Sequence, residues 1–433
     1  MPARHVIALA TATALAVAVP VLSCGTAVAA PTAPAASASP ALPAAPVAVG
    51  ATTAPAGFVG LASRRVLDTR NQYWNPDMAQ GKLTAGQNFK ADLGERTSHM
   101  PPTVLPVLPA DATAVVVNVT VTGGTADSYL TLSAAAGDAG TVPATSSINF
   151  TAGQTVANLV TVAVTPGSTM PSVNVYNHAG SVDVVLDVVG YYRVGEANKY
   201  GPLTPVRLAD TRLDAGTLGT GGVRTLQVAK PELGTADATA VVLTVTATNA
   251  TTDTFLSAYP TGSYRGSSSV NVGPGQTVPN QVVVPVGADG KVDIYNNAGS
   301  ADAVVDLVGY YGPSGQGLFS ALKTPTRLSD TRQTSPLSPF SVRRIQATTP
   351  AGAPAGALGA TLNVTATETT DYGHLIVYPD GAARPSTSNL NLTPHATVAN
   401  SVTTGLGNGA FDVYNHSGQT QLITDLTGWF TTS

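Results

Sequence analysis

The sequence is poor in charge and almost free of cysteine. Charged residues make up 11% of its 433 residues, well below the ~25% of an ordinary soluble domain. Lys and Arg nowhere form a cluster, which argues against nucleic acid and against an anionic membrane surface as partners. The single cysteine, Cys24, excludes a disulfide within the chain. Packed cores and hydrogen-bond ladders must therefore supply the stability.

Sequence motifs for catalysis and metal binding are also missing. The sequence contains no His-Glu-x-x-His, no Gly-x-Ser-x-Gly and no phosphate loop. A zinc site would need three or four convergent ligands, and no such set is evident. We therefore expect neither an enzyme nor a bound metal or cofactor. A polysaccharide-active hydrolase remains an alternative, because its two carboxylates can lie far apart in sequence.

The N-terminal region is predicted to be an export signal followed by a spacer. Residues 1–29 combine a short basic start, an uncharged apolar run and the small-x-small sequence Ala27-Val28-Ala29. We expect a secreted protein without a transmembrane segment in the mature chain. The sequence before Cys24 resembles a lipobox, so a lipoprotein at the cell surface is the alternative. Residues 30–57 are rich in Ala and Pro and are predicted to form a disordered linker.

The remainder of the chain repeats itself three times. Each copy opens on Arg-x-x-Asp-Thr-Arg and closes on Asp-x-x-Gly followed by two aromatic residues. The closing glycines, Gly190, Gly309 and Gly428, follow one another at intervals of 119 residues. A period of this kind decides the architecture before local propensities do. The copies are expected at residues 58–195, 196–315 and 316–433.

Each copy contains seven or eight short runs typical of strands, separated by Pro, Gly, Asn and Asp. No helical period is present, and such spacing is typical of sandwiches and barrels. We predict an all-β protein of three tandem β-sandwich-like domains. The alternative is a six-bladed β-propeller, in which 24 strands form six four-stranded blades. The first copy carries an insertion near residues 71–106 that is either a contact loop or a plain surface excursion.

These motifs resemble a known group of secreted proteins. The Leu-x-x-x-Arg-x-x-Asp-Thr-Arg opening, with Leu61 and Leu203, and the Asp-x-x-Gly-Tyr-Tyr close are similar to β-rich repeats of Streptomyces-like actinobacteria. Such repeats often stand beside cell-wall or polysaccharide hydrolases. The resemblance covers residues 58–433 and implies an accessory, surface-associated role. It carries over no site residues.

The aspartate of each closing motif is predicted to form an ion pair. Asp187 lies in a nearly continuous apolar run, and such strands are usually buried on both faces. A lone buried carboxylate is costly, whereas an Arg fork can meet it with two parallel hydrogen bonds. The expected pairs join Arg65 or Arg70 to Asp187, Arg207 or Arg212 to Asp306, and Arg327 or Arg332 to Asp425. A charged ligand pocket is the alternative role.

A Tyr-Asn pair near the end of each copy is the candidate ligand site. The pairs are Tyr176 and Asn177, Tyr295 and Asn296, and Tyr414 and Asn415. Rings for stacking and amides for hydroxyl groups would suit a sugar, although Tyr-Asn-x-x-Gly is also what a tight turn requires. We therefore predict a non-catalytic protein that binds cell-wall or other extracellular glycans, or another extracellular protein. A structural spacer or assembly component is the alternative.

Overall fold

The computed structural model describes residues 52–71, 81–96, 104–134, 142–164, 167, 169–214, 216–263, 266–350 and 352–433. The predicted signal peptide, Cys24 and nearly all of the predicted linker lie outside these ranges. So do residues 72–80 and 97–103 of the insertion. In the part of the chain that the structure describes, no helix has the length and apolar character needed to cross a bilayer.

The described residues of the first repeat form ten strands. In chain order they are β1 (Gly57–Asp68), β2 (Asn88–Asp92), β3 (Gly94–Arg96), β4 (Val104–Pro106), β5 (Ala112–Thr122), β6 (Ser128–Ala134), β7 (Ile148–Phe150), β8 (Val156–Ala163), β9 (Ser172–Asn177) and β10 (Asp183–Arg193). They form an inner sheet in the order β1-β10-β5-β8 and an outer sheet in the order β2-β9-β6-β7. Strands β3 and β4 pair separately within the insertion.

The second and third repeats have the same two sheets without the extra pair. The second contains β11 (Lys199–Asp210), β12 (Val223–Gln227), β13 (Ala240–Thr248), β14 (Thr254–Pro260), β15 (Val270–Val272), β16 (Val278–Pro285), β17 (Lys291–Asn296) and β18 (Asp302–Gly312). The third contains β19 (Leu318–Asp330), β20 (Val342–Gln346), β21 (Gly359–Thr367), β22 (Gly373–Pro379), β23 (Leu390–Leu392), β24 (Val398–Gly405), β25 (Ala410–Asn415) and β26 (Gln421–Thr431). Single 3₁₀ turns follow β12 (Pro231–Leu233) and β19 (Thr331–Gln333).

The inner and outer sheets differ in how they are buried. Strands β5 and β13 of the inner sheets are buried along almost their whole length, as expected for continuous Val-rich runs. Strand β9 of an outer sheet instead alternates between buried and half-buried residues, which is typical of a sheet with one face on a core. Inner and outer sheets of one repeat share a core, to which Val117 of β5 and Val175 of β9 both belong.

The second faces of the three inner sheets meet in one shared core. Six aromatic side chains fill it, and all are at most 2% exposed. They are Phe58, Tyr192, Tyr200, Tyr311, Phe319 and Phe430. The rings of Phe58 and Tyr311 stack with centroids 4.2 Å apart, and Tyr200 stacks on Phe430 at the same distance. Three repeats therefore contribute to one aromatic cluster, which we call the shared core.

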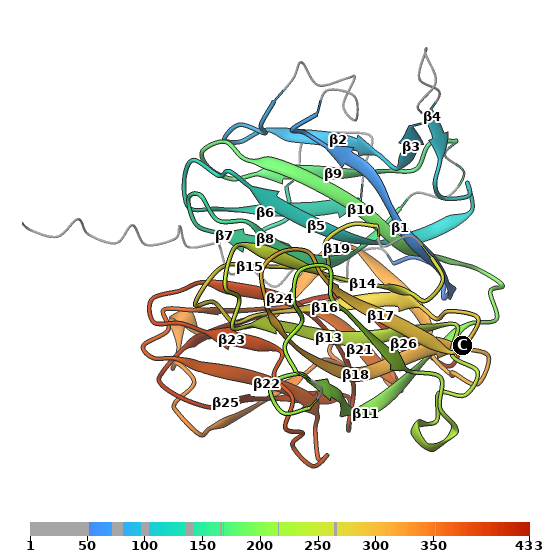
Figure 1. Ribbon diagram of the computed structural model, residues 1–433. Coiled ribbons are helices and arrows are strands. Elements are labelled where there is room, and N and C mark those ends of the chain that lie inside the picture. The colour runs from blue at the N-terminus through green and yellow to red at the C-terminus, as the bar shows by residue number, and fades with distance from the viewer. Residues whose placement is uncertain are drawn as a thin grey trace, which may run out of the picture. The chain divides into compact units, whose positions relative to one another are not determined.

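This arrangement confirms the all-β class and corrects the leading architecture. The six four-stranded antiparallel sheets form the six-bladed β-propeller that the sequence left as the alternative, and the prediction of three tandem β-sandwich-like domains is wrong. The physical reason is that each inner sheet carries apolar side chains on both faces. Its second face must be buried against the other repeats rather than left in water. Figure 1 shows the strands of all three repeats lying against one another.

Residues just before the first strand complete this arrangement. Thr53 N–H donates to the Ala321 carbonyl at 2.9 Å, and Ala56 N–H donates to the Phe319 carbonyl at 3.0 Å. The start of the first repeat is thus paired with the third repeat. Among the described residues, Thr52 is already paired with Leu322, within the last part of the predicted linker.

The closing glycine of each repeat is required by the shared core. Gly190 on β10 pairs with Gly60 on β1, and the ring of Phe58 lies over it. A Cβ at position 190 would overlap that ring, which is fully buried and cannot move away. Gly309 under Tyr200 and Gly428 under Phe319 repeat the arrangement. An aromatic ring covering a strand glycine restores the packing that the glycine lacks.

We expect Tyr200→Phe to raise the free energy of unfolding by about 1 kcal/mol, because the Tyr200 hydroxyl is buried without a partner among the described residues. The equivalent positions hold Phe58 and Phe319. Urea denaturation measures the change. Tyr192→Phe is the control: it should lower stability by about 1 kcal/mol, because the Tyr192 and Tyr311 hydroxyls hydrogen-bond at 2.6 Å. A loss of stability in Tyr200→Phe would contradict the prediction.

Candidate functional site

The opening and closing motifs meet in an ion-pair network inside each repeat. Arg65 Nε donates to Asp187 Oδ1 at 2.9 Å, and its Nη2 donates to Oδ2 at 3.2 Å. Arg65 Nη1 also reaches Asp68 Oδ2 at 3.1 Å. Arg70 donates two further hydrogen bonds to Asp68, from Nε to Oδ1 at 2.8 Å and from Nη2 to Oδ2 at 2.6 Å. The Arg-x-x-Asp-Thr-Arg motif is thus a chain of alternating charges that ends on the closing aspartate.

The same network occurs in all three repeats. The carboxylates that β10, β18 and β26 contribute are at most 1% exposed. The pairs found are Arg65–Asp187, Arg207–Asp306 and Arg327–Asp425. The second arginines, Arg70, Arg212 and Arg332, instead bind Asp68, Asp210 and Asp330. In each repeat the first of the two candidate arginines makes the predicted pair.

The pKa values of the two aspartates in each network are shifted in opposite directions. Burial raises the pKa of Asp187 above its ordinary value, although Arg65 partly opposes the rise. Burial also acts to raise the pKa of Asp68, but the hydrogen bond and charge of Arg70, together with Arg65, lower it overall. Asp187 therefore depends on Arg65 for its charge, which fits a role in tying β1 to β10.

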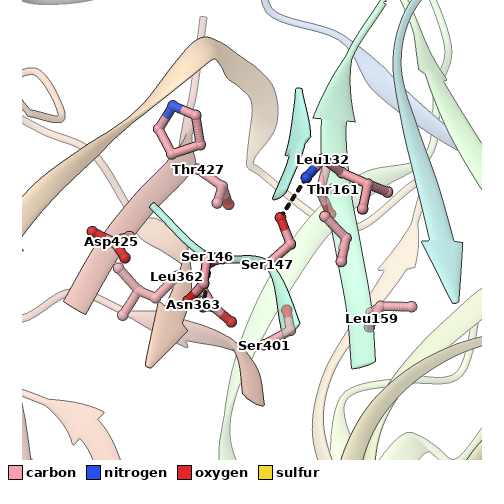
Figure 2. Close-up of a pocket in the computed structure, with 12 residues that line it drawn as sticks. Leu132, Ser146, Ser147, Leu159, Thr161, Leu362, Asn363, Ser401, Asp425 and Thr427 are labelled. Atoms are coloured by element: carbon pink, nitrogen blue, oxygen red, sulfur yellow. Dashed lines mark hydrogen bonds between the residues drawn. The ribbon is translucent and has the colours of Figure 1, made fainter. Parts of the chain in front are cut away.

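A loop of the first repeat covers the ion-pair network of the third repeat. Arg327 Nη2 donates to the Ala144 carbonyl at 3.3 Å, and Asn363 Nδ2 donates to the Ser146 carbonyl at 2.7 Å. The remaining space beside Asp425 is about 20 Å³. Figure 2 shows Asp425, Asn363 and Ser146 among the residues that line this space. A polar cavity of this size holds a water molecule and is too small for a ligand.

The asparagines of the candidate ligand pairs hydrogen-bond to backbone carbonyls of the protein. Asn177 is fully buried, and its Nδ2 donates to the carbonyls of Leu83 at 3.0 Å and Gly180 at 3.2 Å. Asn296 and Asn415 make the equivalent bonds to Leu218 and Gly299, and to Leu337 and Gly418. These amides hold turns and loops, so the prediction that they contact a sugar is corrected.

The tyrosines of the same pairs point to the opposite side, onto the outward faces of the outer sheets. Tyr176 is half-buried, whereas Tyr295 and Tyr414 are only 6% and 5% exposed. The guanidinium of Arg384 lies 3.8 Å from the centroid of the Tyr414 ring. The three rings therefore share a position in the fold but differ in how much surface they offer.

Sequence reasoning missed a second pair of side chains beside these tyrosines. In the first repeat Tyr129 stacks on His178 with centroids 4.5 Å apart. In the third, His374 stacks on His416 at 4.4 Å. The second repeat has Phe255 and Asn297 there, and Asn297 N–H donates to the Phe255 carbonyl at 3.1 Å. The recurrence of His178 and His416 at matching positions was the available signal.

One of the two stacked imidazoles of the third repeat, that of His374, has an unusual pKa. Burial, followed by the nearby His416 and Arg384, lowers the pKa of His374 to about 4. His374 is therefore neutral at physiological pH and offers a ring face rather than a charge. Within the described ranges, no group of three or more His, Cys, Asp or Glu side chains is placed to hold a metal ion.

Comparison with known proteins adds no family. No family model matches the chain, and no curated protein matches it either. Among solved structures, the triple jelly roll protein of an archaeal virus turret aligns at 8% identity with a TM-score of 0.17, covering 87% of this chain and 96% of that chain. A structure from Sulfolobus Turreted Icosahedral Virus aligns at 8% identity and the same TM-score, covering 88% and 98%. At that TM-score neither likeness carries an argument.

Proposed function

We propose that this chain is a secreted, surface-associated and non-catalytic protein that binds cell-wall or other extracellular glycans. The observation that carries the proposal is a pair of side chains that recurs beside a tyrosine on the outward face of each outer sheet. In the first and third repeats this pair consists of two stacked rings. In the first repeat the pair is Tyr129 and His178, beside Tyr176. Aromatic faces with polar edges suit sugar rings, which present both apolar C–H faces and hydroxyl groups.

Three such faces on one body support tighter binding than one face alone. The shared core holds the three repeats in a single unit. Weak sites that are held in a fixed relation gain avidity wherever a polymer can reach two of them together. A long surface glycan offers repeated binding units, so it fits this arrangement better than a small free ligand does.

A structural spacer is the second candidate, and the burial of Tyr295 and Tyr414 favours it. Rings that are almost fully covered contribute to packing rather than to a binding surface. A spacer requires only a rigid body and no ligand. The two candidates differ in whether the purified chain is retained on glycans.

Retention of the full chain on purified cell walls, cellulose and chitin tests the proposal. We expect retention on at least one of these, and we expect Tyr176→Ala to weaken it because that ring is the most accessible of the three. Combining it with Tyr295→Ala and Tyr414→Ala should weaken retention by at least about tenfold, with folding checked by urea denaturation. If the chain is retained on none of these polymers, the proposal of glycan binding is wrong and the structural spacer is the remaining candidate.

A further inference from the structure

A hollow at the junction of the first and second repeats lies on the outward face of the second outer sheet. Its volume is about 370 Å³. The turn between β7 and β8 forms one wall, and β14, β15 and the segment after β17 form the other. Ligand pockets run from about 300 to 1,000 Å³, so this hollow accommodates one or two sugar units of a glycan.

The register of the outer sheet places an aromatic ring between two amides. Phe255 on β14 pairs directly with Asn271 on β15, and the backbone of Asn297 hydrogen-bonds to that of Phe255 on the other side. All three side chains line the hollow. The Asn271 Oδ1 is buried and has no partner among the described residues. A buried amide oxygen without a partner is costly, and a ligand hydroxyl would satisfy it.

The remaining polar groups of the hollow define which ligand fits. Asp253 is exposed and contributes a carboxylate, while the exposed Gln276 uses its Oε1 to accept from Gly273 N–H at 2.8 Å. The Nε2 of Gln276 can donate at the same time. None of the lining residues is Lys, Arg or His. One carboxylate with amides and no cation favours hydroxyl groups and disfavours an anionic sugar.

The equivalent positions of the other repeats are built differently. Asp253 corresponds to Asp127 in the first repeat, whose Oδ1 accepts from Ala152 N–H at 2.9 Å. In the third repeat the same position is Tyr372, which is 70% exposed. Asn297 is replaced by His178 and His416, which stack on neighbouring rings. The combination of carboxylate, amide and phenyl ring is specific to the second repeat.

The geometry points to this hollow as a binding site for a neutral, hydroxyl-rich sugar unit of a glycan. The inference rests on the proposed function and names the ligand class for one of its three faces. The phenyl ring of Phe255 packs against the sugar ring, and Asn271, Asn297 and Asp253 hydrogen-bond its hydroxyl groups. The turn of the first repeat closes the site from the other side, so binding requires both repeats.

Isothermal titration of the full chain with three trisaccharides tests the inference. Chitotriose and cellotriose are neutral, and trigalacturonate is an anionic match in length. We expect at least one neutral trisaccharide to bind and trigalacturonate to bind at least about tenfold more weakly. Asn297→Ala and Asp253→Ala should each weaken neutral binding by about tenfold. Tyr372→Ala, at the position equivalent to Asp253, should leave it unchanged.

The outcomes separate this inference from the proposed function. Retention on cell walls with no effect of the two hollow variants on any trisaccharide would overturn the inference and leave the proposed function standing. Tighter binding of trigalacturonate, or equal weakening by Tyr372→Ala, would overturn it as well. Absence of binding to every polymer and trisaccharide would overturn both.

Discussion

Phe430→Ala is expected to lower the free energy of unfolding by about 3–5 kcal/mol. Phe430 is fully buried in the shared core, where its ring lies 4.2 Å from the centroid of Tyr200 and 5.0 Å from that of Phe319. Truncation removes the apolar area and leaves a cavity that rings from the other repeats cannot fill. Urea denaturation followed by tyrosine fluorescence measures the loss.

The shape of the transition also tests how the repeats are coupled. Because three repeats contribute to one core, the whole protein should still unfold in a single transition at a lower urea concentration. Leu213→Ala is the control, since Leu213 is 86% exposed and its loss should change stability by no more than about 0.5 kcal/mol. Two transitions, one of them unchanged from the parent, would mean that the repeats fold independently.

Arg327→Leu is expected to cost about 3–5 kcal/mol. The change removes both hydrogen bonds to Asp425, including that from Nε at 2.6 Å. Asp425 is 1% exposed, so its carboxylate would be left buried without its main partner. Arg344→Leu is the matched control. It breaks a 2.9 Å ion pair with Asp380 in which the arginine is half-exposed, and such pairs contribute at most about 1 kcal/mol.

The cost of Arg327→Leu should depend on pH in a defined direction. Burial already raises the pKa of Asp425, and the charge and hydrogen bonds of Arg327 hold it down. Without Arg327 the pKa rises further. A carboxyl group with a higher pKa in the folded than in the unfolded state lowers the free energy of unfolding at pH values above its folded pKa. At pH values below its unfolded pKa it has no such effect, because it is protonated in both states. The deficit relative to the parent should therefore shrink as pH falls from neutrality toward 3.8, the ordinary value.

A second substitution separates the charge from the shape of the site. Replacing a buried ion pair by apolar groups on both sides is often neutral, so adding Asp425→Leu to Arg327→Leu should recover most of the stability. If the double variant is as unstable as the single one, the loss reflects packing. A deficit that stays constant with pH would likewise contradict an origin in the buried charge.

The ion pairs could be predicted because their reasons are local. Asp187 lies in an apolar run, and a carboxylate there needs a cation whatever the rest of the fold is. The repeat supplies only two recurrent arginines near its start. Which of them binds Asp187 depended on register: Arg65 pairs directly with Asp187 across β1 and β10, whereas Arg70 lies beyond the end of β1.

The candidate ligand residues were harder to assign from sequence because neighbours on a strand face opposite sides. Tyr176 and Asn177 are adjacent in sequence, yet one faces outward and the other is fully buried. Of the two stacked rings beside Tyr176, His178 directly follows the same strand, whereas Tyr129 comes from β6. The hollow at Phe255 is formed partly by a different repeat, and no motif within one repeat could indicate it.

The sequence by itself determined the all-β class, the threefold repetition and the pairing of opening and closing charges, because each follows from residue periodicity or from the cost of burying a charge. Only the tertiary structure decided that the repeats share one aromatic core and which polar groups face solvent. Both depend on how the second face of each inner sheet is buried. That burial is set by contacts between residues more than a hundred positions apart, such as the Tyr192–Tyr311 hydroxyl pair.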